Sequence, residues 1–202
     1  MKKHGKLLLK YLLLFVMTVF VMGCFSVSAA TKTGFVTQKG KTYYINKDGS
    51  KQKGWLELKG KKYYFDKKTG VQVKGWAKDS KGKRYFYNAN GAKGYMATGW
   101  LTDSKKNTRY FNPSTGYMTT KWATISNKKY YFYSGNGVAA KSTFLTDSKN
   151  VTRYFTSKCF MATGWATTST AKKRYFDPST GAMYTGFRKI GSYTYYFYKS
   201  KK

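Results

Sequence analysis

The sequence predicts an all-β protein, a β-hairpin solenoid of about eight repeats of 20–24 residues preceded by a signal peptide. Three observations lead to this prediction. Aromatic residues make up 19% of the chain, an aromatic residue recurs at nearly constant spacing, and glycine-containing turn sequences separate the aromatic clusters. A fixed period of this length is typical of a solenoid, in which each unit buries its apolar face against its neighbours.

Each repeat opens with an aromatic residue that follows glycine in most units. The opening residues are Phe35, Trp55, Trp76, Trp100, Trp122, Phe144, Trp165 and Phe187. A cluster rich in aromatic rings ends ten or eleven residues later, at Ile45, Phe65, Phe86, Phe111, Phe132, Phe155, Phe176 and Phe197. The residue before this last position is always tyrosine: Tyr44, Tyr64, Tyr85, Tyr110, Tyr131, Tyr154, Tyr175 and Tyr196.

The second repeat shows why each unit is expected to be a hairpin. Lys59-Gly60 stands between two runs of alternating side chains, which predicts a two-residue hairpin turn that places Trp55 opposite Tyr64. Alternation along the strands then creates two faces. One face carries Leu56, Leu58, Tyr63 and Phe65, and the other carries Trp55, Glu57, Lys62 and Tyr64. We expect the first face to stack on neighbouring repeats and the second to repeat a tryptophan and a tyrosine.

The connections between repeats have their own pattern. A second turn, such as Asp66 to Gly70 or Asp177 to Gly181, leads from each hairpin into the next. Four methionines stand four residues before the next opening aromatic, at Met96, Met118, Met161 and Met183. Because methionine fills irregular apolar gaps, we expect these side chains to pack where hairpins meet.

The first 30 residues differ from the rest. Lys2, Lys3 and Lys6 precede an apolar run from Tyr11 to Met22, and Ser28-Ala29-Ala30 supplies small residues for cleavage. This pattern predicts a signal peptide at residues 1–30 and the repeat solenoid at residues 31–202, with secretion or cell-surface localisation and no transmembrane segment after cleavage. The sequence before Cys24 also resembles a lipoprotein signal, so lipid anchoring at Cys24 is a second possibility.

The residues that would remain after cleavage favour binding over catalysis. They include no histidine and seven dispersed acids, of which Asp79, Asp103 and Asp147 fall in turn sequences. Cys159 would be the one remaining cysteine and is expected to be a small buried residue. No metal-binding or cofactor-binding motif is present. We therefore expect a binding protein that is not an enzyme and needs no cofactor.

The strong positive charge suggests the class of ligand. Cleavage after Ala30 would leave 35 basic and seven acidic residues, a net charge of +28. An exported chain of this charge favours an anionic envelope polymer such as teichoic acid, whereas nucleic acid is disfavoured outside the cell. Four arginines precede the Tyr-Phe pair and are candidate anion-binding residues: Arg84, Arg109, Arg153 and Arg174. Alternatively, their long stems cover apolar surface.

The repeat from Gly34 to Phe197 resembles the cell-wall-binding repeat family. The resemblance rests on Gly-Trp, about eight residues, Tyr-Tyr-Phe, a glycine-containing turn, Met-x-Thr and Gly-Trp again. This family includes streptococcal choline-binding modules, glucan-binding regions of extracellular glucosyltransferases and the C-terminal repeats of large clostridial toxins. The resemblance implies hairpin solenoids that hold ligands in grooves between neighbouring hairpins.

The choline-binding branch implies an aromatic cage that this sequence changes at one position. A tryptophan is expected just before the tyrosine pair, but this chain has lysine or threonine there, as at Lys62 and Thr108. This departure favours the glucan-binding and toxin branches, because an ammonium group repels the choline cation that a ring would attract. Choline binding remains an alternative, as does a structural or targeting scaffold without a ligand of its own.

The residues predicted to bind ligand are the tryptophan and tyrosine series on the second face of the hairpins. They are Trp55, Tyr64, Trp76, Tyr85, Trp100, Tyr110, Trp122, Tyr131, Trp165 and Tyr175. The predicted partner is cell-wall teichoic acid or polysaccharide, held by many weak contacts whose combined effect is retention.

Overall fold

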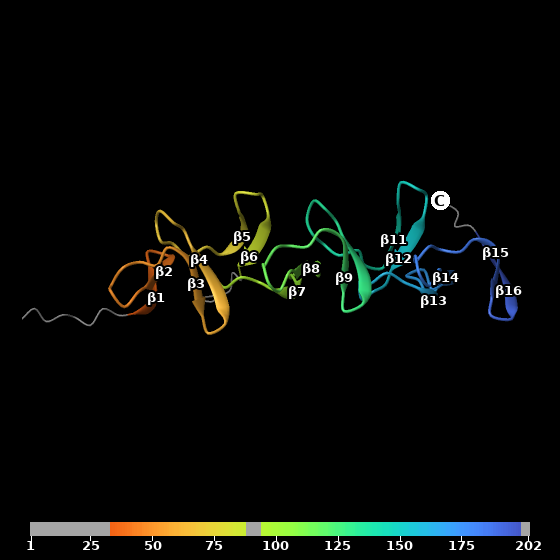
Figure 1. The fold of residues 1–202 in the computed structure, drawn as a ribbon, viewed down its shortest axis with the longest axis horizontal. Coiled ribbons are helices and arrows are strands. Elements are labelled where there is room, and N and C mark those ends of the chain that lie inside the picture. Colours follow the sequence, from red (N-terminus) through yellow and green to blue (C-terminus); the bar gives the residue numbers. More distant parts are fainter. Residues whose placement is uncertain (1–32, 88–93, 199–202) are drawn as a thin grey trace, which may run out of the picture. The chain divides into compact units, whose positions relative to one another are not determined.

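The computed structural model describes residues 33–87 and 94–198 (Figure 1). The predicted signal peptide, including Cys24, lies outside the described residues. The chain divides into two compact units, one ending at Gln52 and the other beginning at Lys53. Among the described residues, no helix is both long and apolar enough to cross a membrane.

The described part of the chain is all-β, as the sequence predicts. The first unit contains β1 (Gly34–Gln38) and β2 (Lys41–Ile45). The second contains β3 (Gly54–Leu58), β4 (Lys61–Phe65), β5 (Gly75–Lys78), β6 (Arg84–Tyr87), β7 (Gly99–Thr102), β8 (Thr108–Phe111), β9 (Lys121–Ile125), β10 (Lys128–Phe132), β11 (Thr143–Thr146), β12 (Thr152–Phe155), β13 (Gly164–Thr167), β14 (Lys173–Phe176), β15 (Gly186–Ile190) and β16 (Tyr193–Phe197).

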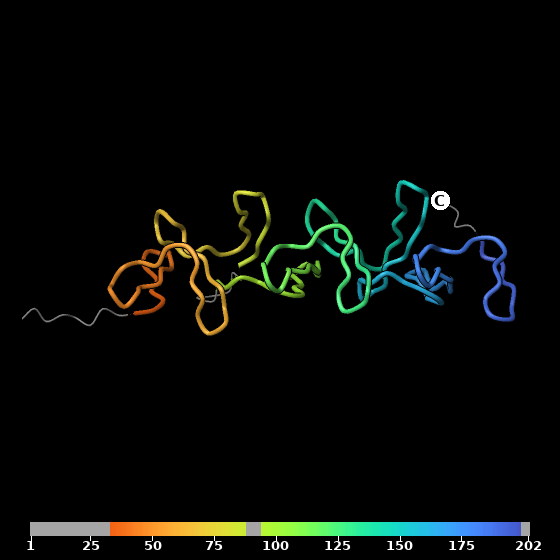
Figure 2. The backbone as a smooth tube through the Cα atoms, viewed as in Figure 1, coloured from red at the N-terminus to blue at the C-terminus, as the bar shows by residue number. Residues whose placement is uncertain are grey.

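Each odd-numbered strand pairs with the strand that follows it, in an antiparallel sheet of two strands. We number these pairs hairpin 1 (β1–β2) to hairpin 8 (β15–β16). Figure 2 traces the backbone of the second unit from one hairpin to the next. Because the described sheets never exceed two strands, contacts other than strand pairing must hold neighbouring hairpins together.

The turn residues explain the two kinds of hairpin. Lys59 and Gly60 both have positive φ, as the tightest hairpin turn requires, and Trp55 lies opposite Tyr64 as predicted. Hairpins 3, 4, 6 and 7 instead have five-residue loops. The loop of hairpin 4 begins at Asp103, whose carboxylate accepts hydrogen bonds from the amides of Lys105 and Asn107. The turn-forming role expected for this aspartate is confirmed.

The two predicted faces of hairpin 2 differ in burial. Phe65 is fully buried and Tyr63 nearly so, whereas Trp55 on the other face is 49% exposed. The ring that ends the second strand is also fully buried in later hairpins, at Phe111, Phe132, Phe155 and Phe176. These terminal rings form the core of the second unit, because burying an aromatic side chain removes a large apolar area from water.

The connecting segments bind each hairpin to the one before it. After hairpin 4, the amide of Met118 donates to the carbonyl of Arg84 in hairpin 3, and the next amide, of Thr119, donates to Tyr110 in hairpin 4. The same pair of bonds follows hairpins 3, 5, 6 and 7. Each connection therefore joins two successive hairpins, which confirms the solenoid in the second unit.

The methionines of these connections pack against glycines of the next turn. Met118 lies against Gly137, and Met96 and Met161 lie in the same way against Gly116 and Gly181. A Cβ atom at any of these glycines would come within 3.0 Å of the methionine side chain. The predicted packing role of these methionines is confirmed.

Cys159 is buried against Tyr130, Phe132 and Ala139, as expected for a small apolar residue. It has φ +69° in the turn that follows hairpin 6, whereas the turns after hairpins 2, 4, 5 and 7 carry a glycine with positive φ. Burial raises the pKa of its thiol. The irregular sixth repeat therefore keeps the turn by placing a small non-glycine residue in the left-handed region.

Replacing Phe132 with Ala should lower the free energy of unfolding by about 3 to 5 kcal/mol, because it empties the fully buried terminal position of hairpin 5. The control is Phe187→Ala, since that ring is 70% exposed. Chemical denaturation monitored by circular dichroism measures both variants. Equal losses in the two variants would contradict the assignment of the core.

Replacing Gly137 with Ala should lower the free energy of unfolding by about 1 to 3 kcal/mol, because the new methyl group meets Met118 and the residue has φ +67°. The matched control is Gly135→Ala, two residues earlier, where an added methyl group would have no atom within 4 Å. The same denaturation measurement applies. A Gly135→Ala variant as unstable as Gly137→Ala would show that the methionine contact is not the cause.

Candidate functional site

The tryptophan that opens a repeat remains accessible on the outward face of its hairpin. Between 39% and 49% of each of the five tryptophan residues is exposed. Isolated exposed apolar residues are common, whereas here half-exposed indoles recur at regular intervals. These indoles are the starting point of the candidate site.

The predicted tyrosine partner lies across the hairpin from the tryptophan in four cases. The ring centroids of Trp55 and Tyr64 are 5.0 Å apart, in an edge-to-face arrangement. The corresponding pairs are Trp100 with Tyr110 at 5.0 Å, Trp122 with Tyr131 at 5.4 Å and Trp165 with Tyr175 at 5.2 Å. The structure thus brings together eight of the ten predicted ligand-binding residues as cross-strand pairs.

The expected pairing of Trp76 with Tyr85 is wrong. Trp76 lies opposite Phe86, and the terminal position of hairpin 3 belongs to Tyr87. The five-residue loop that begins at Asp79 lengthens the hairpin by one residue relative to hairpin 2, and the sequence alignment missed this residue. Because a shift of one residue moves a strand side chain to the other face, Tyr85 is buried.

The next hairpin places a side chain beside each tryptophan, and the sequence did not identify which residue it would be. The ring of Trp100 in hairpin 4 lies 4.9 Å from Tyr130 and 5.9 Å from Phe132, both in hairpin 5. In the same way, Trp55 faces Tyr85 at 6.1 Å and Trp165 faces Tyr195 at 5.1 Å. We call these three sites the ring-walled grooves. Tyr85 therefore faces Trp55 rather than Trp76.

Two other tryptophans face an arginine where the ring-walled grooves have tyrosine. The guanidinium carbon of Arg109 lies 5.2 Å from the ring centroid of Trp76, and that of Arg153 lies 5.6 Å from Trp122. Arg109 and Arg153 occupy the strand position of Tyr130, two residues before the terminal ring. We call the sites of Trp76 and Trp122 the arginine-walled grooves.

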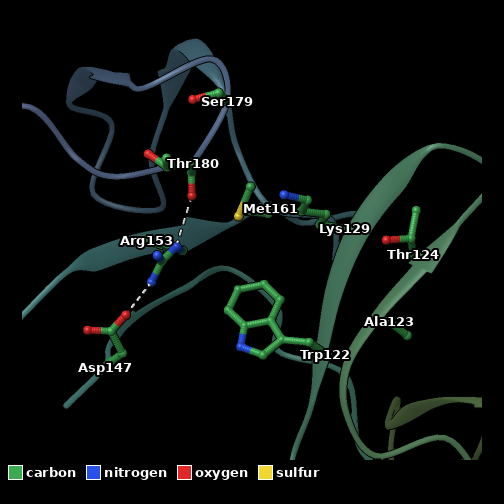
Figure 3. A pocket seen from close by; sticks show the side chains of 9 residues that line it. All are labelled: Trp122, Ala123, Thr124, Lys129, Asp147, Arg153, Met161, Ser179 and Thr180. Carbon is green, nitrogen blue, oxygen red and sulfur yellow. Dashed lines mark hydrogen bonds and ion pairs between the residues drawn. The ribbon is translucent and has the colours of Figure 1, made fainter. Parts of the chain in front are cut away.

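Both arginines are held in place by two hydrogen bonds. Arg153 donates through Nη1 to Asp147 Oδ2 at 2.7 Å and through Nε to the carbonyl oxygen of Thr180 at 3.0 Å. Figure 3 shows the indole of Trp122 pointing toward this anchored guanidinium. Arg109 makes the equivalent bonds to Asp103 and Asn136, each at 2.9 Å.

These ion pairs change the charge that a ligand would meet. The hydrogen bond from Arg109 lowers the pKa of Asp103 to about 2, so its carboxylate is charged at neutral pH. Arg153 shifts the pKa of Asp147 in the same direction. Each arginine therefore already has a carboxylate partner, and its predicted anion-binding role stays a prediction.

The other two candidate arginines have different surroundings. Arg84 does not occupy the position of Arg109, because of the same one-residue shift, and it donates to the carbonyl oxygen of Gly135 at 2.7 Å. Arg174 lies 5.9 Å from the ring of Phe144, in a hairpin whose loop begins with Thr168 instead of aspartate. The four arginines thus do not form one equivalent series.

A third hairpin completes the grooves. The Trp122 groove, about 480 Å³ in volume, is lined by Ser179 and Thr180 from the turn that follows hairpin 7. The Trp100 groove, about 290 Å³, is lined by Ser157 to Cys159 from the turn that follows hairpin 6. Each of these sites therefore requires residues from three successive hairpins.

The ring-walled grooves present uncharged rings to a ligand. Burial raises the pKa of Tyr130 above its ordinary value near 10, so this phenol is neutral at physiological pH. Lys141 and Lys158 also line the Trp100 groove. In the part of the chain that the structure covers, no three His, Cys, Asp or Glu side chains gather into a possible metal site.

Comparison with known proteins identifies the repeat. The family model of the choline-binding repeat matches residues 32–70, 57–93 and 145–185, just over half of the chain. A second model, of a cell wall binding repeat, matches residues 120–139 and 185–200. No curated protein sequence matches the chain.

Solved structures give the same result. Choline binding protein F from Streptococcus pneumoniae is 28% identical with a TM-score of 0.68, and the match covers 82% of this chain and 56% of that protein. A structure of the same protein with a tetrasaccharide-pentapeptide analogue of peptidoglycan matches equally well. The modular autolysin LytC from Streptococcus pneumoniae, in complex with a synthetic peptidoglycan ligand, is 24% identical with a TM-score of 0.50 over 81% of this chain and 37% of the autolysin, and shares the fold.

These matches favour the choline-binding branch. The lysine or threonine in place of the cage tryptophan had instead suggested the glucan-binding and toxin branches. The chain spans little more than half the length of choline binding protein F. Its repeats match the family models, and its fold matches that of choline binding protein F. The chain belongs to the family of choline-binding, or cell-wall-binding, repeat proteins.

Proposed function

We propose that this chain is an exported, non-catalytic module that attaches to choline-bearing teichoic acid of the cell wall through its ring-walled grooves. The observation that carries this proposal is the Trp100 groove. There, a 43% exposed indole stands within 6 Å of three other rings, and two of them belong to the next hairpin.

The chemistry of such a groove suits a quaternary ammonium group. A cation gains about 0.5 to 2 kcal/mol from a well-placed ring face, and most when the site excludes water. Trimethylammonium groups cannot donate hydrogen bonds, so a pocket of rings satisfies them without polar partners. The rings of Trp100, Tyr110 and Tyr130 offer this environment.

The lysine or threonine that replaces the cage tryptophan is compatible with choline binding. The sequence argument against choline rested on lysine or threonine standing where a ring precedes the tyrosine pair. In hairpin 4 this residue is Thr108, which also lines the Trp100 groove. Because Tyr130 of the next hairpin lines this groove beside Trp100, the loss of that ring leaves an aromatic site.

The charge of the chain supports an anionic polymer as the bearer of choline. The full chain has a net charge of +32. The lysines that line the Trp100 groove would lie near the phosphates of a teichoic acid while the rings hold its choline groups. Repeated grooves then turn weak single contacts into retention on the wall.

The proposal also includes export of the chain and a role without catalysis. Some proteins with related repeats are modular autolysins, so repeats of this type can accompany an enzyme. The dispersed aspartates of this chain serve turns and arginine pairs, which favours a purely binding role. The predicted signal peptide at residues 1–30 supports secretion or display at the cell surface.

Changing both Trp55 and Trp100 to Ala should release most of the protein from isolated choline-containing cell walls, because it removes the exposed indole from two ring-walled grooves. A pull-down with elution by choline chloride, sodium chloride or soluble glycan measures retention and its chemical basis. We expect choline to elute the unmodified protein at a concentration at which sodium chloride does not.

The matched control is Tyr193→Ala, which removes a ring that is 70% exposed and lies outside the tryptophan pairs. It should bind as the unmodified protein does. Unchanged retention of the double variant would contradict the proposal. Elution by glycan alone would assign the grooves to a sugar ligand instead.

A further inference from the structure

The two kinds of groove differ at one strand position. This position lies two residues before the terminal ring of a hairpin and faces the tryptophan of the preceding hairpin. It is Tyr85, Tyr130 or Tyr195 in the ring-walled grooves and Arg109 or Arg153 in the arginine-walled grooves. A neutral ring in one class is thus replaced by a cation in the other, at the same place relative to the indole.

We propose that this position determines ligand specificity: tyrosine opens a groove to a quaternary ammonium group, and arginine closes it. The inference rests on the proposed function, because it assigns choline to some grooves and denies it to others. Trp76 and Trp122 would then be half-exposed tryptophans that do not bind choline, although the repeat sequence gives them the same opening position as Trp100.

The first physical reason is the loss of a wall. In the Trp100 groove, Tyr130 presents its ring 4.9 Å from the indole. In the Trp122 groove, the equivalent place is taken by Arg153, whose guanidinium carbon is 5.6 Å from the indole. A ligand ammonium there loses one aromatic contact, and the remaining indole already interacts with an internal cation.

The second reason is charge. A ligand cation within contact distance of Trp122 would also lie near the Arg153 guanidinium, which repels it. Asp147 offsets part of this repulsion, but its carboxylate is already hydrogen-bonded to Arg153 at 2.7 Å. The amides of Lys149 and Val151 bind the other oxygen of Asp147.

The third reason is that the arginines cannot readily swing aside. Moving Arg153 would break its bonds to Asp147 and to the carbonyl of Thr180, two hairpins beyond Trp122. Arg109 is fixed in the same way by Asp103 and Asn136. Lys173 also lies over a tryptophan, with its ammonium 5.1 Å from Trp165, but it is an exposed side chain on a flexible stem.

The five tryptophans of the chain allow each groove to be observed separately. A titration of the purified chain with choline chloride, followed through the indole N–H signals in ¹H–¹⁵N NMR spectra, reports on one groove per signal. Single Trp→Phe substitutions assign the signals, and an equal concentration of sodium chloride corrects for ionic strength. We expect the Trp100 signal to shift and saturate, with Trp76 and Trp122 shifting at least fivefold more weakly at the same choline concentration.

Reciprocal variants test the position itself. Arg153→Tyr should make the Trp122 signal respond to choline with at least about a fivefold lower apparent Kd, and Tyr130→Arg should remove the response of Trp100. Arg153→Tyr combined with Asp147→Asn separates the gain of a ring from the effect of a freed carboxylate, and should respond equally. Should Arg153→Tyr fold poorly, the Tyr130→Arg variant and the comparison of Trp100 with Trp122 in the unmodified chain still test the inference.

The outcomes distinguish the two proposals. No saturable response at any tryptophan of the unmodified chain would overturn the proposed choline-binding function, and the inference with it. A response of Trp122 equal to that of Trp100 in the unmodified chain would overturn only the inference. So would a Tyr130→Arg variant whose fold is intact and whose Trp100 signal still responds.

Discussion

The paired hydrogen bonds of the connecting segments are the interaction on which the second unit depends. Each hairpin is a separate two-stranded sheet, which has little stability alone in water. Adjacent amides such as those of Met118 and Thr119 donate to two successive hairpins and fix their separation. Methionine packed on glycine and a buried terminal ring then fill the space between them. The groove beside each indole is therefore a consequence of the spacing that stabilises the fold.

This dependence explains why the candidate sites are composite. The indole comes from one hairpin, the facing ring or guanidinium from the next, and the outer edge from the turn after a third. No single repeat contains a complete site. Binding and folding thus use the same neighbour contacts, and a change that loosens a connection is expected to weaken the groove it supports. Variation at one strand position can still change a groove without changing the fold, as Tyr130 and Arg153 illustrate.

Much of the fold could be predicted from sequence because the repeat makes the same local features recur. Lys59-Gly60 fixes the turn, and the period of two then places Trp55 opposite Tyr64, as observed. The error at Tyr85 arose because a longer loop adds one residue to hairpin 3. The length from Gly75 to Tyr87 would have indicated this, since the other hairpins with five-residue loops have the same length. The facing residues of the next hairpin could not be assigned, because they depend on how hairpins stack. The carboxylate partners of Arg109 and Arg153 depend on loop conformation and were missed for that reason.

The central claim is that the ligand is held between successive hairpins and not on one hairpin alone. A crystal structure of the chain with bound choline tests it most directly. We expect an ammonium group in contact with the indole of Trp100 and the ring of Tyr130 at the same time. Choline bound only to rings of a single hairpin, or only at the lysine-rich surface away from the indoles, would contradict it.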